Sequence, residues 1–316
     1  MPIPGFEQQI QQYNPLEWLA NKLVSGYLTG MHASPYQGFS VEFSEHRNYY
    51  PGESIKHIDW KLYARSDKLF VKKYEEETNL RAYILIDTTA SMHFPAEKRN
   101  KQVTLEKMNK LQFSILATAV IAQLLRKQRD AVGLAFVSDR LEEFLPAKSS
   151  PYHFKLFYQK LLEQWNSNFD SKGGHVANLP DHLHYLAERI PKRSLVVVFS
   201  DLLDIYDNKE SFFDALHHLH FQQNEVVIFH VMEKRHEINL DYPGNFYKFI
   251  DLEQKQEIKL NPHELQTEYK SAMQAFIHEI ENRIIQYNGD YHSAFIDEGF
   301  DYIIRTYFNK RRKMRR

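Results

Sequence analysis

Between residues 81 and 297, short apolar runs alternate with longer segments in which apolar positions recur every three or four residues. This alternation is typical of strands that alternate with helices around a mostly parallel sheet. The third run is apolar on both faces, which indicates a central strand with helices on either side. The apolar runs predict five strands, at Ala82–Asp87, Ala131–Val137, Leu195–Ser200, Val226–Val231 and Tyr291–Ile296.

The amphipathic segments predict helices at Thr104–Lys127, Tyr152–Trp165, Leu179–Arg189, Lys209–Phe221 and Pro262–Tyr287. Asn288 and Gly289 then form a helix stop before the last strand. A short strand at Leu141–Leu145 is expected to pair as a hairpin with the second strand. The whole pattern predicts an α/β, Rossmann-like fold, with a mostly parallel central sheet and helices on both faces.

The first eighty residues lack this regular alternation. Residues 5–30 predict one or two amphipathic helices, and Gly38–Ser44 and Leu69–Tyr74 predict strands on either side of a turn-rich stretch. So little regular structure cannot bury a core of its own. We therefore expect residues 1–80 to form an N-terminal extension packed on a main domain of residues 81–316.

Composition narrows the classes of protein that fit. The 316 residues include 40 Lys and Arg against 41 Asp and Glu, so the charge of −1 gives no electrostatic case for binding nucleic acid or anionic lipid. The absence of cysteine excludes disulfides and thiolate chemistry and fits a reducing compartment. No signal-peptide pattern opens the sequence, and the apolar run Ser114–Leu125 is shorter than the ~18–20 residues of a spanning helix. We expect a cytoplasmic protein that does not span a membrane.

The main candidate site lies where two predicted strands end. Asp87 ends the first strand, and the hydroxyl residues Thr89 and Ser91 follow at two-residue intervals, while Asp201 follows the third strand. Open α/β sheets bind ligands at the carboxyl ends of their strands, so adjacent strands would bring the two carboxylates to one cation. Oxygen-only ligands select a hard cation, Mg²⁺ or Mn²⁺. Neutral hydroxyls would leave that cation able to accept a partner's carboxylate, which predicts a binding site rather than a hydrolytic centre.

From spacing alone, a purely structural interpretation stands beside this one. Asp87 and Asp201 would then be ordinary loop acids after strands, and Ser91 would cap the next segment. Other motifs give weaker signals. The sequence contains no phosphate-binding glycine loop and no zinc-protease motif. The histidine groups at 182–184 and 217–220 fall on predicted helices, where adjacent side chains point to different faces, so they favour exposed or core-edge histidines.

Upstream of the first strand, a multi-part motif resembles the signature of the bacterial domain-of-unknown-function family 58. That signature combines R-x-Y-x-P-G-D/E, I-D-W and A-R elements and leads into a von Willebrand factor A domain. The similarity extends from about residue 35 to residue 312. The residues that carry the signature are Arg47, Tyr49, Pro51, Gly52, Asp59, Trp60 and Arg65.

Two interpretations of this signature remain open. The charged and aromatic residues could form a recognition patch. Alternatively, Asp59 could pair with an arginine while Trp60 attaches the extension to the sheet, and the burial habits of tryptophan favour this structural role. Pro51 and Gly52 form a turn in either case.

The resemblance also bears on the candidate metal site. Asp87, Thr89 and Ser91 are similar to the D-x-S-x-S metal-ion-dependent adhesion site of A domains, and Asp201 matches that site's later Asp. A third loop of such sites usually supplies a Thr, but His175 stands there in this chain. His175 and Asn178 are therefore the candidate third-loop contributors, and the missing Thr weakens the case for tight metal binding.

For function, the resemblance implies a non-enzymatic, metal-dependent adaptor that works with a MoxR-type AAA+ ATPase and its client. Two alternatives remain. One is a Mg²⁺-dependent phosphohydrolase with Asp87 as nucleophile, although that chemistry usually needs a second carboxylate where Thr89 stands. The other is a structural scaffold whose metal site stays empty, an alternative that His175 favours.

Overall fold

The computed structural model describes residues 14–32, 46–48, 60–66, 69–72, 80–95, 108–139, 141–167, 178–206, 209–251, 256–300 and 302–306. By its internal contacts the chain divides into two compact units, residues 28–79 and residues 1–27 together with 80–316. The expected packing of residues 1–80 on the main domain stays a prediction.

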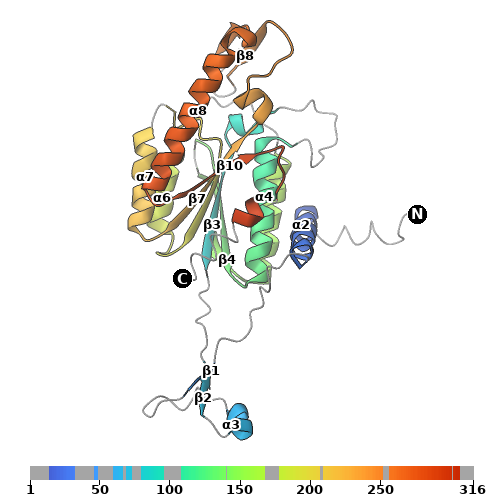
Figure 1. The fold of residues 1–316 in the computed structure, drawn as a ribbon, viewed down its shortest axis with the longest axis vertical. Coiled ribbons are helices and arrows are strands. Elements are labelled where there is room, and N and C mark those ends of the chain that lie inside the picture. The colour runs from blue at the N-terminus through green and yellow to red at the C-terminus, as the bar shows by residue number, and fades with distance from the viewer. Residues whose placement is uncertain are drawn as a thin grey trace, which may run out of the picture. The chain divides into compact units, whose positions relative to one another are not determined.

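The larger unit contains a six-stranded sheet in the order β10-β7-β6-β3-β4-β5 (Figure 1). Five strands run parallel, and the edge strand β5 pairs antiparallel with β4, as the predicted hairpin requires. All five predicted strands are confirmed to within one residue at each end. The strands are β3 (Arg81–Asp87), β4 (Ala131–Val137), β5 (Leu141–Lys148), β6 (Leu195–Ser200), β7 (Glu225–Met232) and β10 (Asp290–Phe295).

The strand order places a crossover at the centre of the sheet. From β3 the chain proceeds outward to β4 and β5, and then returns to lay β6, β7 and β10 on the opposite side of β3. Ile86 of β3 pairs with Phe199 of β6, so these two strands end side by side. Ligands of open α/β sheets bind at such a switch point, outside the carboxyl ends of the strands.

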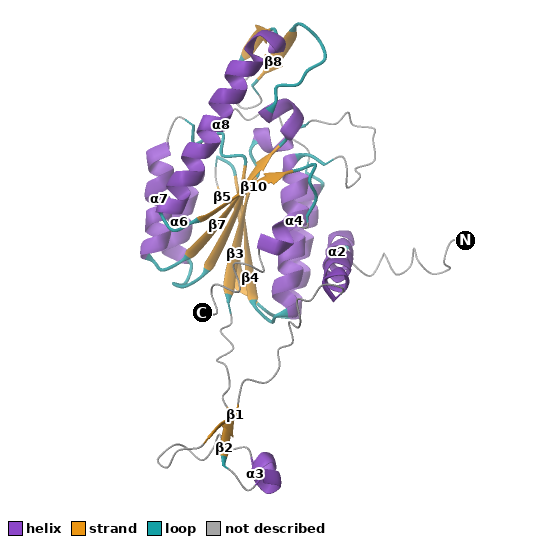
Figure 2. Cartoon of the chain, in the orientation of Figure 1, coloured by secondary structure: helices purple, strands orange, loops and turns teal. Residues whose placement is uncertain are grey.

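Helices cover both faces of this sheet (Figure 2). On one face lie α4 (Lys110–Lys127) and α5 (Pro151–Trp165), and on the other lie α6 (Leu179–Arg189), α7 (Lys209–Phe221) and α8 (Pro262–Gln286). From Ala82 to Asp87 every side chain of β3 is buried, as in a strand with helices on both sides. The predicted α/β architecture with a mostly parallel sheet is confirmed.

One predicted helix start was wrong. The apolar spacing predicted a helix from residue 104, but Met108 and Asn109 are not helical and α4 begins at Lys110. Asn109 accepts a hydrogen bond from the Gln112 amide (2.8 Å), and the Gln112 side chain accepts one from the Asn109 amide (3.2 Å). This reciprocal capping box fixes the start of α4 at Lys110. Residues 104–107 lie outside the described residues.

The predicted N-terminal helical segment includes α2 (Pro15–His32). Leu16, Ala20 and Val24, each four residues apart and therefore on one face, are buried. Glu17 forms an ion pair with Arg126 of α4, and the Asn14 side chain donates to the Tyr158 carbonyl of α5 (2.8 Å). The start of α2 therefore packs over α4 and α5.

Several short elements were not predicted. A hairpin of β8 (Tyr247–Ile250) and β9 (Glu257–Leu260) precedes α8, and a single π-helical turn, η3 (Lys234–Ile238), follows β7. Strands of four residues and a five-residue turn are too short for periodicity to reveal. No helix in the described part of the chain has both the length and the hydropathy needed to cross a bilayer.

The smaller unit contains a two-stranded antiparallel sheet of β1 (His46–Asn48) and β2 (Phe70–Lys72), and the helix α3 (Trp60–Ser66). Strand β2 falls within the predicted Leu69–Tyr74. The predicted strand at Gly38–Ser44 lies outside the described residues.

Candidate functional site

Asp87 lies at the carboxyl end of β3 and is 2% exposed. One carboxylate oxygen accepts a hydrogen bond from the Thr89 amide (2.9 Å), and the other accepts one from the Ser200 hydroxyl (2.6 Å). Ser200 is the last residue of β6, so this second bond joins the ends of the two central strands. Both donors are neutral, and none of the residues that the structure describes places a cation beside Asp87.

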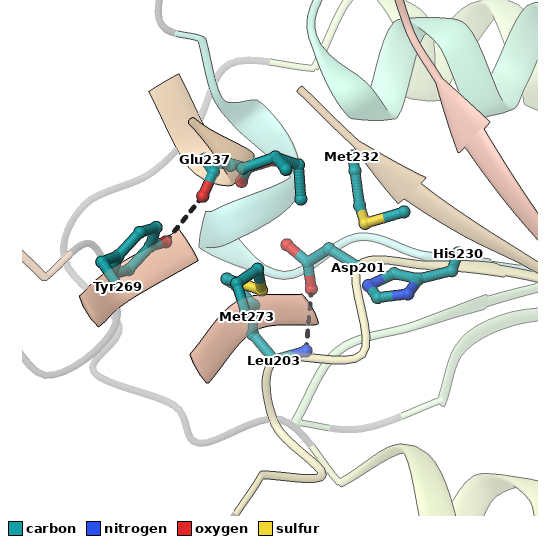
Figure 3. A pocket seen from close by; sticks show the side chains of 8 residues that line it. Asp201, Leu203, His230, Met232, Glu237, Tyr269 and Met273 are labelled. Carbon is teal, nitrogen blue, oxygen red and sulfur yellow. Dashed lines mark hydrogen bonds between the residues drawn. The ribbon is translucent and has the colours of Figure 1, made fainter. Parts of the chain in front are cut away.

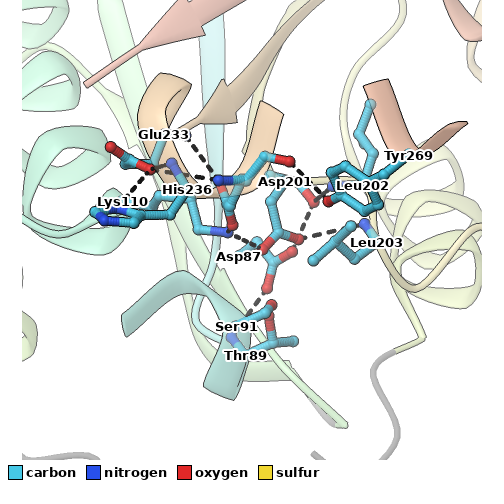
Figure 4. Close-up of polar contacts among 12 residues, drawn as sticks. Asp87, Thr89, Ser91, Lys110, Asp201, Leu202, Leu203, Glu233, His236 and Tyr269 are labelled. Carbon is cyan, nitrogen blue, oxygen red and sulfur yellow. Dashed lines mark hydrogen bonds and ion pairs between the residues drawn. The ribbon is translucent and has the colours of Figure 1, made fainter. Parts of the chain in front are cut away.

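The two predicted hydroxyl ligands, Thr89 and Ser91, lie at the same edge of the sheet (Figure 4). Ser91 belongs to the 3₁₀ turn η2 (Ala90–His93), and its hydroxyl lies 3.0 Å from that of Thr89. The Ser91 side chain also lowers the pKa of the Asp201 carboxylate, so the two groups lie close together. The structure therefore brings together the four residues that were predicted to share a cation, Asp87, Thr89, Ser91 and Asp201.

Asp201 follows β6 directly and is 3% exposed. The Leu203 amide donates to its Oδ1 (3.3 Å), and the Lys110 ammonium donates to its Oδ2 (2.7 Å). Asp201 therefore has a full cation beside it, whereas Asp87 has none among the described residues.

Lys110, Glu237 and Ser200 are site residues that sequence reasoning missed, and Lys110 is the most deeply buried charge among them. It is fully buried, and its ammonium forms ion pairs with Asp201 and with Glu237 of the π-helical turn. Its backbone amide donates to the Phe94 carbonyl just after η2 (3.0 Å). Lys110 thus connects the loop after β3, the start of α4, the end of β6 and the turn after β7.

This role could not be recognised from the sequence, because the predicted helix began at Thr104 and placed Lys110 inside it. Lys110 is the first residue of α4, where the helix dipole disfavours a cation, and the first turn of α4 has no acidic residue. A buried ammonium in that position needs carboxylates from elsewhere in the fold. The sequence could neither locate this lysine at the helix start nor name its partners.

The π-helical turn orients Glu237 toward Lys110. Glu233 caps the turn and accepts hydrogen bonds from three of its amides. In return, Glu237 Oε2 accepts a bond from the Glu233 amide (2.7 Å), which leaves Oε1 for Lys110. Tyr269 of α8 donates to the Glu237 carbonyl (2.7 Å). Single π-turns inside proteins often lie at functional sites, and this one positions a carboxylate.

The charges of the site shift several pKa values. Burial, followed by the charges of Asp201 and Asp204, raises the pKa of Asp87 to about 7. Burial alone would raise the pKa of Asp201, but the Lys110 charge and the hydrogen bonds to Asp201 lower it below its ordinary value. Burial likewise raises the pKa of Glu237, although Lys110 opposes the shift. The acids of the site therefore repel one another, and Lys110 offsets only part of their charge.

A cavity of about 70 Å³ adjoins Asp201 (Figure 3). Burial lowers the pKa of His230, which lines it, to about 4, so this imidazole is neutral; its Nδ1 lies 2.6 Å from the Tyr291 hydroxyl. The cavity therefore combines two carboxylates with a mostly apolar wall. Its lining residues are Asp201, Leu203, His230, Met232, Glu237, Ile238, Tyr269 and Met273.

The donor set fits a hard divalent cation such as Mg²⁺. Asp87 and Asp201 offer carboxylates and Thr89 and Ser91 offer hydroxyls, all oxygen donors. Within the described residues, no three His, Cys, Asp or Glu side chains are placed to hold one ion together. The hydroxyls would therefore have to take part in binding a metal.

The other predicted site residues lie elsewhere or outside the described residues. Asn178 caps α6, and its side chain accepts a hydrogen bond from the Asp181 amide (3.3 Å). His175 lies outside the described residues, as do Tyr49, Pro51, Gly52 and Asp59. Of the remaining signature residues, Arg47 lies on β1, Trp60 begins α3 and Arg65, also in α3, is exposed.

Fold and site together define a mixed α/β protein with a mostly parallel sheet and a buried polar site at the switch point. The sequence profile of the family described as "Protein of unknown function DUF58" matches residues 45–278, and the chain belongs to this family. Among curated proteins, it is similar to uncharacterised proteins of Mycobacterium tuberculosis and Mycobacterium bovis. Each is 22% identical over 191 residues, which cover 60% of this chain and 55% of the relative. The match thus spans about half the length of these relatives.

Two solved structures are also similar. The conserved hypothetical protein BatB from Bacteroides thetaiotaomicron aligns with a TM-score of 0.45 and 12% identity, over 74% of this chain and 99% of that one. A mutant of the PilB minor pilin from Streptococcus sanguinis aligns with a TM-score of 0.42 and 9% identity, over 78% of this chain and 65% of that one.

Proposed function

We propose that the chain is a non-enzymatic binding protein with a von Willebrand factor A-like main domain, whose strand-end site receives an acidic side chain of a protein partner at a divalent cation. The observation that carries this proposal is the convergence of Asp87 and Asp201 at the ends of adjacent central strands, which the Ser200–Asp87 hydrogen bond joins. The strand order, with one antiparallel edge strand, and the D-x-T-x-S spacing after the first strand support the A-like assignment.

Asp87, Thr89, Ser91 and Asp201 would hold the cation directly or through water. With two carboxylates and two neutral hydroxyls around it, a bound Mg²⁺ or Mn²⁺ supplies positive potential that a partner's carboxylate completes. Asp87 fits the role of the main ligand, since its charge has only neutral donors beside it.

The size of the adjoining cavity favours a protein partner over a small molecule. Pockets that enclose metabolites usually measure about 300–1,000 Å³, whereas this cavity measures about 70 Å³. Leu203, which lines it, is 44% exposed, and Tyr206 three residues later is 62% exposed. Exposed apolar side chains beside a buried polar centre suit the insertion of one side chain from a folded partner.

For the partner itself, the proposal follows the family resemblance and names a MoxR-type AAA+ ATPase, with its client as a further ligand. Pull-down of the full chain by a purified ATPase of this type, in Mg²⁺ and in chelator, tests it. We expect Asp87→Ala and chelator each to weaken binding at least tenfold. Asp214→Ala, which removes an exposed carboxylate from α7, is the matched control and should bind normally. Equal binding by folded Asp87→Ala in both buffers would exclude this site as the contact.

The phosphohydrolase alternative gains little from the geometry. Both oxygens of Asp87 already accept hydrogen bonds, and Thr89 offers no carboxylate to serve as acid or base. Mg²⁺-dependent hydrolysis of a phosphate ester that is lost in Asp87→Asn would nevertheless replace the binding proposal. If neither metal nor partner affects the chain, the scaffold alternative applies.

A further inference from the structure

We infer that Lys110 is a built-in counter-ion of the strand-end site and competes with a divalent cation for the Asp201 carboxylate. This inference rests on the proposed cation site and concerns its regulation by the chain's own lysine. It starts from the location of Lys110, whose side chain is fully buried between Asp201 and Glu237.

Both oxygens of Asp201 already accept a hydrogen bond. Its Oδ2 accepts from Lys110 and its Oδ1 accepts from the Leu203 amide. A cation that approaches Asp201 therefore meets a positive charge 2.7 Å from the oxygen it needs. It must either keep away from that oxygen or displace the ammonium toward Glu237.

Asp87 presents the opposite case. Its partners are the Thr89 amide and the Ser200 hydroxyl, both neutral. Within the part of the chain that the structure describes, the charges of the site are therefore unevenly balanced, because Lys110 compensates Asp201 and no cation compensates Asp87. A divalent cation is attracted on the Asp87 side and repelled on the Asp201 side, so the wild-type chain should bind it weakly.

Displacement of the ammonium has a structural route. Glu237 is fixed by Glu233 and is the second partner of Lys110, so the ammonium can remain paired while it leaves Asp201. Glu237 and Ile238 of the π-helical turn also line the cavity beside Asp201. Movement of Lys110 would therefore shift the residues that line this cavity, where the partner is proposed to enter.

A simpler role is a permanent structural ion pair, and the two roles predict different responses to metal. A structural lysine, once removed, leaves buried carboxylates that metal does not rescue. A competing lysine, once removed, leaves a better metal site. Lys110→Met keeps much of the side-chain volume and deletes the charge, so it separates the two roles.

The experiment measures Mg²⁺ and Mn²⁺ binding by calorimetry, and the melting temperature with each ion and with chelator, on the full chain. We expect Lys110→Met to bind Mg²⁺ at least tenfold more tightly than wild type and to melt higher in Mg²⁺ than in chelator. The matched control is Lys160→Met, since Lys160 forms a more exposed ion pair with Glu143 of β5; it should behave as wild type. An affinity of Lys110→Met no higher than that of wild type overturns the inference.

If the Lys110→Met protein does not fold, a charge-balanced variant takes its place. The double variant Lys110→Met/Glu237→Gln removes one cation and one anion and so keeps the net charge of the site. It should still bind Mg²⁺ more tightly than wild type, because the competitor at Asp201 is gone, and equal affinity overturns the inference.

The outcomes also separate this inference from the proposed function. Tight Mg²⁺ binding by the variant with none by wild type supports a competing lysine and removes metal dependence from the proposed function. Binding by neither protein overturns the inference, whereas the pull-down with the ATPase remains an independent measure of the partner.

Discussion

Ser200 donates a 2.6 Å hydrogen bond to Asp87 and thereby joins the ends of β6 and β3. The same hydroxyl accepts a hydrogen bond from the Leu202 amide (3.0 Å), which shapes the turn that presents Asp201. One serine thus orients both carboxylates of the candidate site.

Replacing this serine should destabilise the fold. Ser200→Ala leaves a buried carboxylate with one donor fewer, and we expect a loss of about 1–3 kcal/mol in the free energy of unfolding. Urea denaturation measures it. Ser167→Ala, which removes a hydroxyl from an exposed residue, should change stability by less than about 0.5 kcal/mol. A Ser200→Ala protein as stable as this control would show that the bond contributes little.

The pairing of Lys110 with Asp201 should appear as a coupling energy. In chelator, Lys110→Met should destabilise the chain by about 3–5 kcal/mol, since it strands buried carboxylates. In a double-mutant cycle with Asp201→Asn, the double variant should lose less stability than the sum of the two single losses. We expect the difference to be about 0.5–3 kcal/mol. Additive losses, measured by urea denaturation in chelator, would mean that the two residues act separately.

At α2, apolar burial should outweigh the ion pair. Leu16 is buried, and Leu16→Ala should cost about 2–4 kcal/mol. Glu17 pairs with the partly exposed Arg126, so Glu17→Gln should cost no more than about 1 kcal/mol. Thermal unfolding of both variants, compared at low and high salt, shows which of the two substitutions costs more stability. The reverse order would indicate that charge, rather than packing, holds this helix to α4 and α5.

His153 should make stability depend on pH. Burial lowers its pKa below the ordinary value and Lys148 adds to the shift, although the hydrogen bond to the Val132 carbonyl opposes it. The unfolded chain therefore binds more protons, so the contribution is complete above about pH 6.5 and is lost as the pH falls from there toward the folded pKa. Unfolding free energies of wild type should fall more between pH 7 and pH 5 than those of His153→Gln. An equal fall in the unfolding free energy of the two proteins over this pH range would contradict the prediction.

Sequence periodicity located the sheet well, for a physical reason. Strands such as Leu195–Ser200 are buried on both faces, so their whole length is apolar and their ends are marked by polar residues. The apolar pattern did not predict local structure where hydrogen bonds, rather than burial of apolar side chains, determine it. The capping box at Asn109 starts α4 later than its apolar spacing predicts, and the π-helical turn depends on Glu233 rather than on any period.

The candidate site divides in the same way. Asp87, Ser91 and Asp201 could be grouped from sequence because the ends of adjacent parallel strands meet at one edge of a sheet. Lys110 and Glu237 could not, since their contact spans 127 positions and depends on how α4 packs against the turn after β7. The charge balance of the site therefore needed the structure.

The Ser200–Asp87 contact bridges residues 113 positions apart in the chain. Such distant contacts form late, after the entropy of closing a long loop has been overcome. A fragment that ends before β6, or a nascent chain that has not yet made it, lacks half of the site. Any ion or protein that recognises the complete site therefore binds only the finished domain, and by mass action it stabilises that state over every partly folded one.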